Sequence, residues 1–350
     1  MELVSPSVTR LVTMQNRNES LNIALMKKIE RCGRIAYRSE DKITDDSYIR
    51  FIKGIVQRGH WSVLEHSRIT LNIKRSFFQE ADFEVLCDYL NSHHFLNHSF
   101  MRDVEPWFSI SGNFRAFLEW LSISTSQPCS MRYIKHYLAK QFPPVFGGLI
   151  DDDDMFEPRA ELFHLVEDPA YFTYHVVTDR GVMAEWTRHR YNMSFTVEST
   201  RYCNYNKKGV TFCLPIPFIW SPTEDANDQK FLYNLLKQCG CIGDEGEGVF
   251  YTCMNGVSFD GVSYLAANFH TMCLWLQHME ACERVYNEMI ERKLSPQEAR
   301  SVLPQSLKSE FCVTGTKEAW DHFLELRTVS DAHPQIRYLA NMIQKELKNA

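Results

Sequence analysis

The side chains most suited to binding and catalysis are concentrated between Thr187 and Tyr205, in the segment TRHRYNMSFTVESTRYCNY. Its basic members are Arg188, His189, Arg190 and Arg201, and its hydroxyl-bearing members include Ser194, Thr196, Ser199 and Thr200. Guanidinium groups with hydroxyl and backbone donors nearby can hold a phosphate or a planar carbonyl. A solvated polar loop is the alternative for an isolated R-H-R triplet, but the preceding apolar Val182, Met183 and Trp186 predict a packed helix that fixes these groups.

Two smaller polar groups lie elsewhere in the chain. Arg300 and Arg327 each stand beside apolar helix positions, where a cation can either contact a ligand or stabilise the helix end. The turn before a predicted strand carries four polar side chains, namely His60, Ser62, Glu65 and His66. These side chains can line a site or simply cap and satisfy the local backbone.

No metal site is expected from the cysteines or the acidic run. The 11 Cys residues are scattered and odd in number, and the start MELVSPSVTRLVTM does not resemble a secretory leader, so we expect buried thiols in a reducing cytoplasm. Only Cys239 and Cys241 lie close together, and C-x-C is not a usual zinc spacing. The adjacent carboxylates of Asp151–Asp154 repel one another, which predicts a solvated loop.

Apolar periodicity and capping residues predict the elements that must position these groups. We expect helices over about residues 20–37, 46–57, 83–90, 112–122, 182–189, 264–292 and 316–326, and another that begins at the capping box Ser295–Glu298. We expect strands over about residues 68–74, 171–178 and 210–214, and a site loop or short strand over 194–205. In the helix expected over 46–57, the inward positions are Ile49, Phe51, Ile52, Ile55 and Val56. In the helix expected over 264–292, they are Leu265, Phe269, Met272, Leu276, Met279 and Val285.

Strands followed by long helices predict an α+β fold with a central, mostly antiparallel sheet rather than a doubly wound α/β fold. No glycine-rich GxGxxG or GxxxxGK[ST] phosphate loop is present. With 350 residues, 44% apolar and 23% charged, the chain can bury a large core, and disorder over most of it is excluded. The net charge of -6 argues against a broad nucleic-acid surface, and no apolar stretch reaches the roughly 18 residues of a membrane span.

Four ordered blocks carry a resemblance to a known family. They are GHWSVLEH at 59–66, RHR followed after eight residues by STRY at 188–202, ARSVLP at 299–304 and LRTVSDAHPQIR at 326–337. In these blocks the chain resembles the flavin-dependent thymidylate synthases. A further block, SISGNFRAF at 109–117, is similar to one in longer members of that family.

The resemblance implies a specific reaction and assembly. Such enzymes bind FAD and dUMP, reduce the flavin with NADPH, take a one-carbon unit from methylenetetrahydrofolate, and release dTMP and tetrahydrofolate. Their fold is α+β, and their active sites form between the subunits of a homotetramer. We therefore expect residues 1–350 to form a single catalytic domain with an inserted elaboration at about 77–168. We also expect a cytoplasmic enzyme, in the host cytoplasm if the gene is viral, with no stable nucleic-acid partner and no membrane association.

The resemblance also assigns roles to individual residues. The expected FAD contacts are His60, Ser62, Arg188, His189, Arg190, Glu198, Thr316 and His322. The expected dUMP contacts are Glu185, Arg188, Ser199, Thr200, Arg201, Arg300 and Arg327, with Ser199 and Arg201 at the phosphate and Arg300 reaching the nucleotide from another subunit. Arg327 is the expected catalytic residue, because a permanently charged guanidinium against the uracil ring favours the ring's ionised N3 form.

Several positions depart from the family pattern. Glu185 stands where the family often has Gln, and Val197 stands where an acidic residue is expected, with Glu198 adjacent. Thr316 and Glu318 replace the Asn and Arg that the family tends to have near the second flavin region, and His322 takes a nearby polar position.

Two other functions are compatible with parts of the sequence. A non-catalytic nucleotide- or RNA-binding protein could retain the same arginine-rich pocket. A folate-only thymidylate synthase would need an activated Cys nucleophile, for which Cys129 in QPCSM is the candidate, but the surrounding pattern does not match that family.

Overall fold

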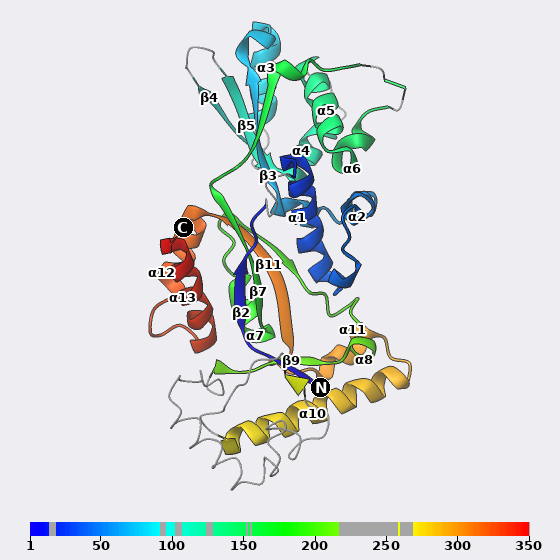
Figure 1. Ribbon diagram of the computed structural model, residues 1–350, viewed down its shortest axis with the longest axis vertical. Helices are drawn as coiled ribbons and strands as arrows, with labels where there is room; N and C mark the ends of the chain where they lie inside the picture. Colours follow the sequence, from blue (N-terminus) through cyan, green and yellow to red (C-terminus); the bar gives the residue numbers. More distant parts are fainter. Residues whose placement is uncertain are drawn as a thin grey trace.

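The computed structural model describes residues 1–13, 19–91, 96–101, 107–123, 129–151, 153–154, 156–216, 258–259 and 269–349. Its central sheet has the strand order β2-β7-β11-β8, and all three neighbouring pairs are antiparallel (Figure 1). The strands are β2 (Ser7–Arg10), β7 (Tyr171–Asp179), β11 (Lys308–Thr316) and β8 (Met193–Val197). The predicted α+β class with a mostly antiparallel sheet is therefore confirmed.

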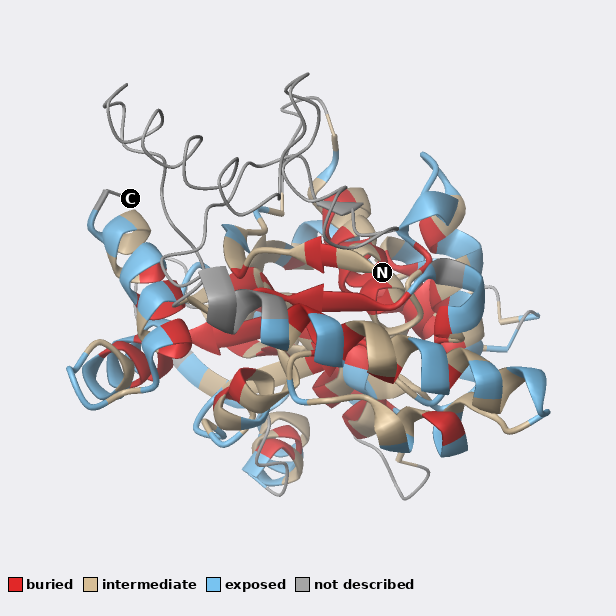
Figure 2. Ribbon diagram, turned by 90° about the horizontal axis from the view of Figure 1, so that it is seen from below, coloured by how far each residue is buried: buried red, intermediate tan, exposed pale blue. Residues whose placement is uncertain are grey.

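Helices cover both faces of this sheet. On one face α7 (Arg180–Trp186), α12 (Lys317–Arg327) and α13 (Pro334–Asn349) pack around Trp186, Phe311 and Phe323. On the other face Cys312 of β11 packs against Cys32 and Ile35 of α1 (Leu21–Ala36). Figure 2 shows the buried strands at the centre of the molecule, with the exposed sides of the helices around them.

The alternation of β11 explains why it is missing from the predicted elements. Phe311 and Val313 face α12, whereas Cys312 and Thr314 face α1 and the turn that follows α2. Both faces of the strand are thus covered, and only Glu310 of its nine residues is not fully buried. A strand buried on both faces lacks the apolar–polar alternation by which a half-buried strand is recognised.

A second antiparallel sheet, with the order β4-β5-β3-β6, forms the upper part of the molecule in Figure 1. Its strands are β4 (Asn97–Met101), β5 (Trp107–Asn113), β3 (Arg68–Lys74) and β6 (Phe163–Glu167). It shares one apolar core with α1, α2 (Ser47–Gln57), α3 (Glu80–Asn91), α4 (Phe114–Leu121), α5 (Cys129–Gln141) and α6 (Pro143–Phe146). The residues expected to be an insertion therefore share a core with elements on their N-terminal side. The single domain remains a prediction.

A third, small sheet with the order β10-β1-β9 contains the parallel pairs. It consists of β10 (Ser258–Phe259), β1 (Glu2–Val4) and β9 (Thr211–Cys213). Its core is shared with α10 (Phe269–Glu291), α8 (Tyr205–Lys208) and α11 (Pro296–Ala299). The capping box predicted at Ser295 and Glu298 is present, but the α-helix that it starts lasts only four residues.

The remaining element predictions are confirmed with shifted boundaries. Helix α7 ends at Trp186 rather than at 189, and the region predicted as helical from 112 begins with the end of β5. Val285 was expected to face inward but is 40% exposed, while Tyr286 beside it is buried; Ile49 is likewise 39% exposed. The predictions for Cys239, Cys241 and Leu265 lie outside the described residues, as do the side chains of Phe269 and Met272.

The acidic run is only partly solvated. Asp151 and Asp153 are exposed, but Asp154 pairs with Arg132 at 2.9 Å and hydrogen-bonds to His136 at 3.0 Å. Within the ranges given above, no helix is long and apolar enough to cross a membrane.

Candidate active site

The R-H-R segment follows a short helix with a well-defined start. The Asp179 side chain accepts a hydrogen bond from the Val182 backbone N–H at 2.8 Å and so caps α7. The Trp186 ring at the other end of α7 is fully buried and packs 4.2 Å from the ring of Phe323 on α12. The residues that follow α7 are thus fixed to the α12 side of the central sheet.

Glu185, His189 and Arg327 form one hydrogen-bonded group across these two helices. The Arg327 Nη1 donates to Glu185 Oε2 at 3.0 Å, and the Arg327 Nε donates to His189 Nε2 at 2.9 Å. A guanidinium can only donate, so Nε2 of His189 is the unprotonated ring nitrogen. Two of the blocks that the sequence singles out therefore meet in space.

His189 is held in its neutral form. Burial lowers its pKa to about 4, and the neighbouring Arg327 and His322 add to the shift. Its ring lies edge-on to Phe323 at 5.0 Å between centroids. At neutral pH this histidine is an oriented hydrogen-bond acceptor rather than a cation.

A second group forms where the chain turns after β8. The Ser199 N–H donates to the Ala36 carbonyl at the end of α1 at 3.0 Å, and the Arg201 N–H donates to Ser199 Oγ at 3.4 Å. Arg300 Nη1 donates to Thr200 Oγ1 at 2.8 Å. The Arg201 side chain is exposed and lies over the ring of Tyr202 at 5.7 Å. This turn gathers cations and hydroxyl groups of the kind that bind phosphate.

Arg300 contacts this turn within one chain. The sequence resemblance instead predicts that Arg300 reaches the nucleotide from another subunit. The hydrogen bond to Thr200 shows that Arg300 reaches this turn within its own chain.

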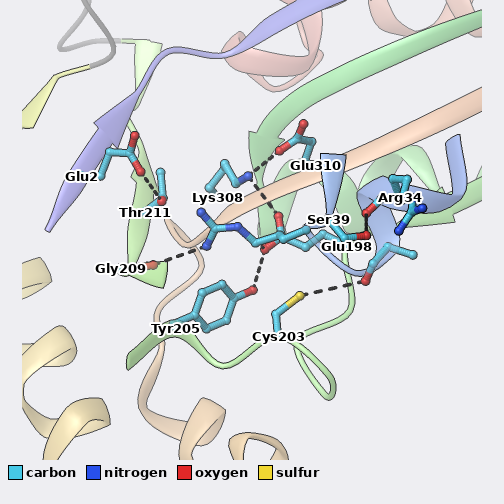
Figure 3. Close-up of polar contacts among 12 residues, drawn as sticks. Glu2, Arg34, Ser39, Glu198, Cys203, Tyr205, Gly209, Thr211, Lys308 and Glu310 are labelled. Carbon is cyan, nitrogen blue, oxygen red and sulfur yellow. Dashed lines mark hydrogen bonds and ion pairs between the residues drawn. The ribbon is translucent and has the colours of Figure 1, made fainter. Parts of the chain in front are cut away.

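Glu198 is not part of an open site, because its carboxylate is buried among internal partners (Figure 3). It accepts a hydrogen bond from the Tyr205 hydroxyl at 2.9 Å, and it pairs with Lys308 at 3.1 Å and Arg38 at 3.9 Å. Lys308 also pairs with Glu310. The carboxylate thus fixes the backbone just before Ser199 to β11.

The charges of this buried network stabilise one another. Burial alone would raise the pKa of Glu310, but the hydrogen bond from His175 and the charge of Lys308 lower it to about 2. Burial likewise opposes the charge of Lys308, yet the carboxylates of Glu198 and Glu310 raise its pKa. Glu310 and Lys308 are therefore both charged at neutral pH.

The third group is the turn between α2 and β3. Gly59 has a φ of +70°, which only glycine adopts without strain, and a 3-10 helix over Trp61–His66 follows. His60 Nδ1 is hydrogen-bonded to the Tyr37 hydroxyl at 2.9 Å. His60, Ser62, Tyr37 and Tyr202 line a cavity of ≈ 430 Å³.

His66 ends this turn and has a role that the sequence does not assign. It is fully buried, with Nδ1 2.8 Å from Thr314 Oγ1 and Nε2 2.8 Å from Thr196 Oγ1. Burial lowers the pKa of His66 to about 3, so the ring is neutral. His66 therefore ties the turn to β11 and β8.

A further cavity of ≈ 260 Å³ collects three arginines from distant parts of the chain, Arg68, Arg115 and Arg190. Glu65 pairs with Arg115 at 2.8 Å, and the Arg68 guanidinium lies 3.8 Å from the centroid of the Tyr171 ring. Arg68 and Arg115 are not among the residues that the sequence predicts. In the sequence, Arg68 is marked only by its place on the polar face of the strand predicted over 68–74. Such a face is equally typical of a strand that faces solvent.

The other predicted site residues are dispersed. Thr316 is 7% exposed and caps α12 by accepting a hydrogen bond from the Ala319 N–H at 3.1 Å, and His322 is exposed on the same helix. Arg188 is exposed. Neither Arg188 nor Arg190 has an ion pair or a side-chain hydrogen bond within the described ranges. The described residues contain no group of three potential metal ligands, and Cys129 is an exposed residue at the start of α5.

Comparison with known proteins gives the family. The model of the thymidylate synthase complementing protein family matches residues 165–350, which include three of the four motif blocks. The chain belongs to this family. Among the relatives is the flavin-dependent thymidylate synthase of Aquifex aeolicus. It is 22% identical to this chain over 345 residues, which cover 91% of this chain and 93% of that one.

Two other relatives match shorter stretches of this chain. A probable flavin-dependent thymidylate synthase of Mycobacterium phage L5 is 24% identical over 57% of this chain and 67% of its own length. The flavin-dependent thymidylate synthase of Mycobacteroides abscessus is 40% identical over 63 residues, or 18% of this chain and 25% of its own. Among solved structures, the UMP/dUMP methylase PolB of Streptomyces cacaoi, bound with 5-Br dUMP, has a TM-score of 0.38 at 14% identity, covering 100% of this chain and 93% of that one.

Proposed function

We propose that this chain is a flavin-dependent thymidylate synthase that methylates dUMP to dTMP. Methylenetetrahydrofolate would donate the carbon, and FAD reduced by NADPH would supply the hydride. The observation that carries the proposal is the contact between Arg327 and His189, which joins the R-H-R block to the C-terminal L-R block. The relatives named for this activity support it.

The turn after β8 is the proposed site of the dUMP phosphate. Ser199, Thr200 and Arg201 present two hydroxyl groups and an exposed guanidinium on a backbone that is fixed to Ala36. A phosphate there would receive charge-assisted hydrogen bonds from donors that are already in place. Arg300, through its contact with Thr200, lies within reach of the same anion.

The chain's residues fit a flavin dinucleotide. Arg188 and Arg190 are exposed, and neither is neutralised by a partner in the described part of the chain, as the binding of a pyrophosphate requires. The cavity beside His60 and Ser62 offers a polar wall and the Tyr37 and Tyr202 rings. Bound FAD would supply the redox chemistry, while the protein positions the substrate and excludes water.

Four of the expected FAD contacts differ in how they could reach the cofactor. Glu198 and Thr316 use their side chains inside the chain, so we propose that only their backbone lies near the cofactor. His322 is exposed on α12, with Nδ1 3.9 Å from Glu325, and can contact a ligand from the solvent side. His189 is proposed to orient Arg327 as well as to contact FAD.

We further propose that each active site is shared between subunits of a homotetramer. The Arg327 group is on the side of the sheet covered by α7 and α12, whereas the Ser199 turn is hydrogen-bonded to the end of α1, which packs on the other side. A nucleotide that contacts both groups is most simply accommodated if a second subunit contributes one of them. We place the enzyme in the cytoplasm, where NADPH and reduced folates are available.

The test combines absorbance with turnover. The purified protein, with FAD added, should show the absorbance of a bound flavin after gel filtration, and it should form dTMP from dUMP, methylenetetrahydrofolate and NADPH. Omitting any one of the three substrates should abolish the product. A protein that binds dUMP but neither retains FAD nor forms dTMP would instead be a non-catalytic nucleotide-binding protein.

A further inference from the structure

The guanidinium of Arg327 is held by acceptors within its own chain. Arg327 is the last residue of α12, and its side chain is 20% exposed. Nη1 is bound by Glu185 and Nε by His189, while Nη2 has no partner among the described residues. Because a guanidinium is planar, fixing two of its nitrogens also fixes the direction of the third.

The two acceptors differ in kind. His189 is neutral and is oriented by Phe323, so it offers one lone pair in a fixed direction. Glu185 offers a charged oxygen from α7, and its side chain is 29% exposed. A partly exposed ion pair of this kind contributes little to stability. Its effect is therefore expected in the geometry of Arg327 rather than in the folding of the chain.

We propose that Glu185 is a positioning residue that aims Arg327 at its ligand. This inference rests on the proposed function, in which Arg327 contacts the uracil ring. The Glu185 carboxylate restricts the rotation of the guanidinium and leaves Nη2 as the nitrogen without a partner among the described residues. A glutamate at this position is thus a partner for the arginine and not a repulsive neighbour of the nucleotide.

The kinetic test uses three single variants. Glu185→Ala removes the acceptor and should lower kcat at saturating dUMP by about tenfold or more, with a smaller change in KM. Glu185→Gln keeps an oxygen acceptor and should retain more than about a third of the wild-type kcat. Asp321→Asn breaks an exposed ion pair with Lys317 on α12 and is the matched control, which should leave kcat unchanged.

A double variant separates positioning from an independent effect. If Glu185 acts through Arg327, then Glu185→Ala should cause no further loss in an Arg327→Ala background. The proposal would be overturned if the double variant lost kcat by the product of the two single losses. A wild-type kcat in Glu185→Ala would also overturn it. If Glu185→Ala does not fold, Glu185→Asp serves instead, because its shorter side chain draws the acceptor away from Arg327 Nη1 and should lower kcat similarly.

A measurement without substrate distinguishes this proposal from the proposed function. The ¹⁵N resonance of His189 Nε2 reports the hydrogen bond from Arg327 in the ligand-free protein. It should shift in Glu185→Ala and remain in place in Asp321→Asn. An unchanged resonance in Glu185→Ala would refute the positioning role even in an active enzyme, whereas a shifted resonance in a protein that forms no dTMP would refute only the assigned reaction.

Discussion

At the scale of single residues, some side chains of the site segments are exposed and available to a ligand, and others bind internal partners that fix the site. Arg201 is exposed, whereas Glu198, three residues earlier, is buried and pairs with Lys308. Two positions of one segment therefore have opposite roles, and substitutions at them should have different effects.

Arg201→Ala should weaken dUMP binding and leave FAD retention intact. The change removes one charge-assisted phosphate contact, whose loss should cost about 1.5–3 kcal/mol. Calorimetric titration with dUMP measures this loss directly. Arg292→Ala, which removes an exposed arginine paired with Glu288, is the control and should leave the affinity unchanged. A wild-type affinity in Arg201→Ala would contradict the phosphate assignment.

At the scale of elements, two buried polar groups attach the site segments to the sheet. His66 joins the turn after α2 to β8 and β11, and the Glu198–Lys308 pair joins the start of the Ser199 turn to β11. Strand β11 therefore positions both the proposed flavin side and the proposed nucleotide side of the site.

The stability of the protein should depend on pH through His66. Its pKa in the folded chain is about 3, below the 6.5 of an ordinary histidine, so the unfolded chain binds the proton first as the pH falls. This contribution to stability is present above pH 6.5 and is lost as the pH falls toward 3. Between pH 7 and pH 5 the loss should be about 2 kcal/mol.

Urea unfolding at the two pH values tests this dependence. His66→Gln can still reach both threonines but does not titrate, so its stability should change less than that of the wild type over the same interval. Equal changes in the two proteins would contradict the assignment. If His66→Gln does not fold, NMR titration of the His66 ring in the wild type should show no protonation down to about pH 4.

Lys308→Met should destabilise the fold by about 3–5 kcal/mol, because it leaves the buried carboxylate of Glu198 without its main cationic partner. The midpoint of urea unfolding measures the effect. The double variant Glu198→Gln with Lys308→Met should recover part of the loss, since it also removes the carboxylate of Glu198 that Lys308 neutralises. Lys317→Met, at an exposed lysine, is the control and should leave the midpoint unchanged. A wild-type midpoint in Lys308→Met would show that the pair is dispensable.

At the scale of the whole molecule, the proposed shared site predicts complementation between inactive chains. Chains carrying Arg201→Ala and chains carrying Arg327→Ala should each be weakly active alone. Mixed tetramers formed by co-expression should regain activity, because about a quarter of the sites would receive both intact residues from different subunits. A mixture no more active than its components would place the whole site within one chain.

The same experiment resolves the position of Arg300. The contact of Arg300 with Thr200 predicts that Arg201→Ala and Arg300→Ala do not complement each other, since both residues then serve one turn of one chain. Recovery of activity in that mixture would support the expectation from the sequence that Arg300 acts from another subunit.

The sequence by itself determined the family, the α+β class and most of the helices. These features depend on local sequence signals: the Ser20 cap, the capping box at Ser295, the alternation in β3, and the spacing from Arg190 to Ser199. Each of them involves residues that are close together in the chain, so periodicity and spacing are sufficient to predict them.

Only the tertiary structure decided which site residues meet and which are internal. Strand β11 escaped prediction because it is covered on both faces, and Arg327 lies 138 positions from the histidine to which it donates. Glu198 and Thr316 look like site residues in the sequence, yet one is an internal ion partner and the other a helix cap. Burial and partners depend on contacts between distant segments, and spacing along the chain carries no information about those contacts.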